Sequence, residues 1–150
     1  RGLFAVGCEL DSSDSWQFGN SERFRSHILH FSAFNSVEPW LFEWVNVTAF
    51  ARDEEWAKLR RPSLEEFIAK RLAPLEKLLG GQDWLGESFT IADIAMVTVL
   101  RAIGGSQLLA DHPATQAYVA RGEARPAFQQ AMNDQLAAFD RHDPPTSMGE

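Results

Sequence analysis

The amino-acid sequence predicts an all-α fold, a bundle of about five to seven helices. Apolar residues recur at helical spacing along most of the chain, and no alternating apolar–polar pattern extends beyond a few residues. Proline residues and Gly–Gly pairs separate the helical stretches from one another. With 150 residues, 45% hydrophobic and 23% charged, the chain has the size and composition of one globular domain.

The first helix is expected from residue 22 to about residue 50. Ser21 is a good N-cap for it, and Glu22 suits the positive end of the helix dipole. Pro39 lacks an amide donor and would clash with the preceding turn. We therefore expect a kink, or two helices that meet near Ser36.

The second helix is expected after the polar stretch RDEEWAKLRRP, residues 52–62. Ser63 and Glu66 have the spacing of a capping box, and leucine residues follow at helical spacing until a Gly–Gly pair at 80–81. Pro74 should bend this helix.

A second capping box, Thr90 with Asp93, begins the next helix. The Thr90 hydroxyl can accept the amide of Asp93, and the Asp93 carboxylate can accept the amide of Thr90. Phe89 and Ile94 are placed for a hydrophobic staple. Because few charges follow until a Gly–Gly pair at 104–105, we expect this helix at the centre of the core.

Two further helices are expected near the C-terminus. The first follows Pro113 and should break at Gly122, and the second begins at Pro126.

Three segments are expected along the chain. Residues 1–20 should form a linker or an irregular N-terminal extension, residues 21–140 the helical domain, and residues 141–150 a flexible tail. Because the chain begins at Arg1 and not at a methionine, we expect it to be a segment of a longer protein.

The charge and the cysteine content exclude several classes of function. The formal net charge is −7 and no basic cluster exceeds the pair at 60–61, so nucleic acid and anionic lipid are not expected partners. No apolar run reaches the roughly 18 residues of a membrane-spanning helix. Cys8 is the only cysteine and lies beside Glu9, so we expect an inert thiol and a cytoplasmic protein.

No residue pattern points to catalysis or to a metal. His27 and His30 are three residues apart on one helix face, but a zinc site needs further ligands that the spacing does not supply. The sequence contains no nucleophile elbow, phosphate-binding loop or zinc-protease motif. We predict neither a catalytic residue nor a metal.

Aromatic residues crowd the segment from residue 31 to residue 44, and this allows two interpretations. They fill the core, or they line an apolar ligand cleft. For the cleft, the polar groups would come from Asn35, Glu38, Glu43 and Asn46. The candidate substrate-binding residues are Phe31, Phe34, Trp40 and Trp44, with Phe42 in the same cluster.

Three segments carry a resemblance to a known family. They are WLGESFTIADIAM at residues 84–96, the leucine-rich RLAPLEKLLGG before it, and AYVARGEARPAFQQAM at residues 117–132. In this order they resemble the C-terminal helical domain of cytosolic glutathione transferases, over roughly residues 21–140. The helix with an internal proline that ends near residue 50 is similar to the first helix of that domain.

The resemblance implies a partner domain and a co-substrate. In the family, a thioredoxin-like N-terminal domain binds glutathione and activates its thiol. The helical domain lines the site for the hydrophobic electrophile and shares in the dimer contact. Residues 1–20 show no β-α-β pattern, so we expect no thioredoxin-like domain in this chain and transfer no catalytic residue to it. The pair Thr90 and Asp93 would have the family's structural role of starting the core helix.

The implied function is that of a helical domain for glutathione conjugation, with little activity on its own, in a homodimer or docked to a thioredoxin-like domain. Two other functions stay open. Transferase-like helical domains also occur as non-catalytic interaction modules attached to translation factors and synthetase assemblies, and an exposed tryptophan patch would favour that function. A stand-alone binder of small apolar ligands would instead use the aromatic cleft.

Overall fold

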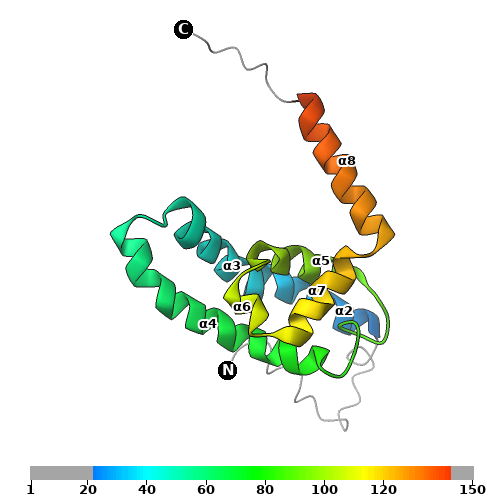
Figure 1. Cartoon of the computed structure of the whole chain (residues 1–150). Coiled ribbons are helices and arrows are strands. Elements are labelled where there is room, and N and C mark those ends of the chain that lie inside the picture. The colour runs from blue at the N-terminus through cyan, green and yellow to red at the C-terminus, as the bar shows by residue number, and fades with distance from the viewer. Residues whose placement is uncertain (1–21, 143–150) are drawn as a thin grey trace.

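The structure of the chain, a computed structural model, describes residues 22–142, and the regular elements of this part are all helical, without strands (Figure 1). The predicted all-α fold is therefore confirmed. The expected extension at 1–20, with Cys8, and residues 143–150 of the expected tail lie outside the described residues. In chain order the elements are α2 (Glu22–Ser32), the π-helical turn η1 (Ala33–Val37), α3 (Glu38–Val45), the π-helical turn η2 (Asn46–Phe50), α4 (Glu55–Leu79), α5 (Ile91–Leu100), the 3-10 turn η3 (Arg101–Ile103), α6 (Gln107–Ala110), α7 (Pro113–Glu123) and α8 (Pro126–His142).

Helix α5 lies at the centre of the bundle, in contact with α2, α3 and α7. Most of its side chains are buried, and the exposed ones are Ile91, Ile94 and Thr98. Met96 and Leu100 are completely inaccessible to solvent. These contacts and this burial confirm the prediction of a central core helix. Burial of apolar side chains is the main stabilising contribution to a fold.

The first helical stretch is interrupted close to the predicted position. Helix α2 gives way to η1 after Ser32, and α3 begins at Glu38 with Pro39 in its first turn. Pro39 has no amide with which to continue the hydrogen-bond ladder, and the π-helical turn directly precedes it. The predicted meeting of two helices near Ser36 is confirmed.

Helix α4 begins earlier than the sequence predicts. The expected start at the capping box 63–66 is wrong, because α4 already runs from Glu55 and the Ser63 hydroxyl donates to the Arg60 carbonyl oxygen within it, at 3.0 Å. The polar residues from Glu55 onward are helical because one stripe along α4 is buried against the rest of the bundle. The expected end at residues 80–81 is confirmed. The buried stripe consists of Ala57, Leu64, Ile68, Leu72, Leu75 and Leu79.

The last two helices begin at the predicted prolines, Pro113 and Pro126. The expected break at Gly122 is wrong, because α7 continues to Glu123 and Gly122 is buried within its last turn. Helix α8 starts beside α7 and then extends away from the rest of the bundle (Figure 1).

Candidate functional site

The buried carboxylate of Asp93 joins three parts of the bundle. Its Oδ1 accepts the backbone amide of Leu85 at 2.9 Å and the hydroxyl of Tyr118 at 3.1 Å. Its Oδ2 accepts the backbone amide of Thr90 at 2.8 Å. The Thr90 hydroxyl oxygen in turn accepts backbone amides of the first turn of α5, which completes the capping box. These bonds satisfy donors that the start of a helix would otherwise leave unpaired.

Tyr118 approaches Asp93 from α7 and is completely buried. Burial raises the pKa of the Tyr118 hydroxyl, and the adjacent Asp93 carboxylate raises it further. The hydroxyl therefore stays protonated and donates to Asp93. Because both carboxylate oxygens already accept hydrogen bonds inside the core, the arrangement is suited to holding α5 and α7 together and not to moving protons.

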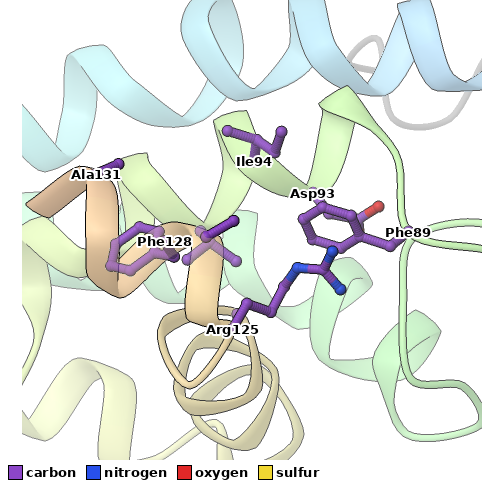
Figure 2. Close-up of a pocket in the computed structure, with 9 residues that line it drawn as sticks. Phe89, Asp93, Ile94, Arg125, Phe128 and Ala131 are labelled. Atoms are coloured by element: carbon purple, nitrogen blue, oxygen red, sulfur yellow. The ribbon is translucent and has the colours of Figure 1, made fainter.

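An apolar groove of about 380 Å³ opens beside this pair, between α5, the end of α7 and the start of α8 (Figure 2). Its volume falls in the range of small-molecule sites, roughly 300–1,000 Å³. Phe89 and Ile94, the residues expected to form a staple, both line it. The complete lining is Phe89, Asp93, Ile94, Val97, Gly122, Arg125, Ala127, Phe128 and Ala131.

Arg125 forms a charged edge of this groove. Its guanidinium carbon lies 3.6 Å from the centroid of the Phe89 ring, and Figure 2 shows the side chain extended toward that ring. A guanidinium over an aromatic face is an attractive cation–π contact. The contact links the start of α8 to the segment before α5.

Phe31 and Phe34 lie on the exposed side of α2 and η1, at 62% and 39% exposure. Both rings meet the His30 ring edge to face, with centroid distances of 5.9 Å and 5.1 Å. We refer to His30, Phe31 and Phe34 as the aromatic face. Two of the four predicted substrate-binding residues thus lie together.

The other two, Trp40 and Trp44, have different surroundings. Trp40 packs on Phe67 of α4, with ring centroids 4.3 Å apart, and adds to the core. The Trp44 indole N–H donates to Glu65 Oε1 at 3.1 Å, and its ring lines a second hollow. Neither this hollow nor the apolar groove brings the four predicted residues together.

A family model of the glutathione S-transferase C-terminal domain matches residues 40–135, more than half of the chain. The chain belongs to this family. The resemblance predicted from three sequence segments is thereby confirmed. No curated protein is detectably similar to the chain. In this glutathione S-transferase domain, the matched region includes the Thr90–Asp93 box and the apolar groove, whereas the aromatic face precedes it.

The transferase domain contains one cap that sequence reasoning missed. Glu76 of α4 accepts the backbone amides of Ala114 and Thr115, both at 2.8 Å, at the start of α7. Desolvation acts to raise the pKa of Glu76, but these hydrogen bonds, the Thr115 hydroxyl and nearby His112 outweigh it, so the pKa is lowered. His112, the residue before Pro113, makes no capping hydrogen bond with its side chain, so the cap comes from another helix. Spacing along the sequence does not reveal such a distant partner.

Between residues 22 and 142, no three His, Cys, Asp or Glu side chains gather as metal ligands would. Over the same range, no helix is both long enough and apolar enough to cross a membrane. His27 is exposed, and His30 belongs to the aromatic face.

Proposed function

We propose that this chain is the helical domain of a glutathione transferase-like protein and that its aromatic face lines the site of the hydrophobic electrophile. Family membership supports the first part. The observation that carries the second is the exposure of Phe31 and Phe34 around His30, on a helix that also packs against α5. Exposed apolar surface of this kind marks binding sites. The assignment of Trp40 and Trp44 to the same site stays a prediction.

The proposed reaction needs a thiolate and an electrophile held close together. Glutathione, the proposed co-substrate, would be bound and deprotonated by a thioredoxin-like domain. Its sulfur would attack the electrophilic carbon, so that a carbon–sulfur bond forms and the leaving group departs with its bonding electrons. The aromatic face would hold the electrophile by ring stacking and apolar burial, which favours reaction through proximity. We assign no proton transfer to this chain.

The apolar groove is the proposed docking surface for the thioredoxin-like domain. Ile94 on its wall and Ile91 one turn earlier are 52% and 54% exposed, at the start of a helix whose other apolar side chains are buried. Isoleucine side chains lose a favourable burial contribution when they face water, so a covering partner would stabilise them. A cytoplasmic homodimer of two-domain subunits, without a metal, completes the proposal.

Two assays on the 150-residue chain test this function. An initial-rate assay with glutathione and an aryl halide should give no rate above the uncatalysed one. Equilibrium binding of the aryl halide alone should be saturable, and Phe34→Ala should weaken it. Phe50→Ala is the matched control, because Phe50 is 79% exposed and lies outside the aromatic face. Rapid conjugation by the chain alone, or equal binding by both variants, would contradict the proposal.

One observation favours the interaction-module alternative. Phe50, Trp56 and Leu59 are 79%, 50% and 74% exposed around the turn between η2 and α4. Apolar side chains exposed in one short stretch are typical of protein interfaces. An aryl halide that does not bind, together with self-association that is lost in the double variant Trp56→Ser and Leu59→Ser by sedimentation, would favour this function instead.

A further inference from the structure

A second hollow, of about 520 Å³, lies between α3, η2, α4 and α6. No residue of the aromatic face lines it. Its apolar wall comes from Trp44, Ala69 and Leu108, and its polar wall from α4 and α6. The volume again falls in the range of small-molecule sites, roughly 300–1,000 Å³.

The Trp44 ring is held in position at this hollow. Its indole N–H donates to Glu65 Oε1 at 3.1 Å, and the Thr48 hydroxyl donates to the backbone carbonyl oxygen of Trp44 at 2.6 Å. Arg61 Nε donates to the same Glu65 oxygen at 2.7 Å. Glu65 therefore orients both an aromatic ring and a guanidinium, and the wall is fixed before any ligand arrives.

The side chains that line the hollow carry a net negative charge. Three carboxylates, Glu65, Glu66 and Asp111, line it with one guanidinium, that of Arg61. Glu65 pairs with Arg61 and Glu66 with Lys70. Asp111 accepts only a neutral amide donor, Gln107 Nε2 at 2.7 Å, and no ion pair joins it to a cation of residues 22–142.

We propose that this hollow binds a small organic cation, an amine whose aryl part packs on Trp44 and whose ammonium group is bound by Asp111. An ammonium group gains both from a carboxylate acceptor and from the face of an indole ring. Asp111 is exposed, so a neutral apolar ligand would leave its charge unpaired, and an anion would be repelled. This inference does not depend on the proposed function, because no residue of the aromatic face or of the apolar groove lines the hollow.

The probe for this site is 2-phenylethylammonium, and phenylacetate is its matched counterpart with a similar body and the opposite charge. Titration calorimetry on the 150-residue chain should show saturable binding of the amine and none of the acid. Added salt should weaken binding of the amine, because a partly exposed ion pair is screened.

Two substitutions should weaken binding of the amine. Asp111→Asn should raise its dissociation constant about fivefold, the size expected of a partly exposed charge pair. Trp44→Leu should raise it by a similar factor, because the cation–π contact and the stacking surface are lost. Asp134→Asn, the same change on exposed α8, is the control and should leave binding unchanged. Thermal unfolding of each variant shows that it is folded.

Three results would overturn the proposal. They are phenylacetate binding as well as the amine, equal weakening by Asp111→Asn and Asp134→Asn, and the absence of saturable binding to the folded chain.

Discussion

Gly122 of α7 lies so close to Val97 of α5 that a Cβ at position 122 would be 2.6 Å from Val97 Cγ2 and 2.9 Å from Cγ1. Val97 is buried and β-branched, so it has no flexible end that could move aside. The two helices therefore meet at a point where glycine fits and a larger residue does not.

Gly122→Ala should lower the free energy of unfolding by about 1–3 kcal/mol, because overpacking a core costs more than alanine returns in helix propensity. Urea denaturation measures the change. Gly81→Ala is the control, since a Cβ at Gly81 meets no atom within 4 Å, and it should change stability by less than about 1 kcal/mol. In a Val97→Ala background the penalty should shrink, because the two methyl groups are gone and only the Cβ at 3.2 Å remains; an undiminished penalty there would place its cause elsewhere.

Asp93→Asn should destabilise the domain by about 2–3 kcal/mol. Each carboxylate oxygen accepts a backbone amide, from Leu85 on one side and from Thr90 on the other. An asparagine nitrogen would face one of these donors in either orientation. Thr90→Ala, which removes only the reciprocal cap, should cost about 1 kcal/mol. Chemical denaturation gives both values, and an Asp93→Asn midpoint equal to that of the unchanged chain would disprove the role of Asp93.

Tyr118 is the only tyrosine, so its ionisation can be followed by the ultraviolet absorbance of tyrosinate. Burial and the Asp93 charge raise its pKa above the ordinary value of 10.0. A folded pKa above the unfolded one stabilises the fold below that ordinary value, and the contribution is lost as the pH rises further. We expect tyrosinate to appear only together with loss of helical circular dichroism. Ionisation near the ordinary pKa in a chain that keeps its helical signal would contradict the buried hydrogen bond.

The cap that Glu76 makes on α7 should depend on pH. Its folded pKa lies below the ordinary value of 4.5, so its stabilisation is present above that value and is lost as the pH falls through the folded pKa. Glu76→Gln should cost about 1–3 kcal/mol near neutral pH and make the decline of stability in acid shallower. Glu87→Gln, at an exposed carboxylate, is the control for denaturation at several pH values. Identical acid profiles for the two variants would refute the cap.

Sequence patterns correctly predicted the helix ends that depend on residues close together in the chain. The box of Thr90 and Asp93, the prolines that begin α7 and α8, and the Gly–Gly pair that follows α4 each act within a few residues of chain. Such interactions can be recognised from spacing alone.

Contacts between distant segments could not be predicted in this way. Ser63 has the spacing of a cap, yet burial of one stripe of α4 carries the helix past it. Gly122 was expected to end a helix, whereas its role is to let α7 approach α5. The partners of two predicted site residues were hidden for the same reason, because Trp40 packs on Phe67 and Trp44 donates to Glu65, both on α4. Periodicity shows which face is apolar but not which helix covers it.

The central claim is that the aromatic face binds the electrophile, and amide chemical-shift mapping tests it most directly. The isotope-labelled 150-residue chain would be titrated with an unreactive aromatic analogue of an aryl halide. The claim predicts that saturable shift changes centre on His30, Phe31 and Phe34. Changes confined to the groove beside α8 or to the hollow at Trp44, with the aromatic face unaffected, would contradict it.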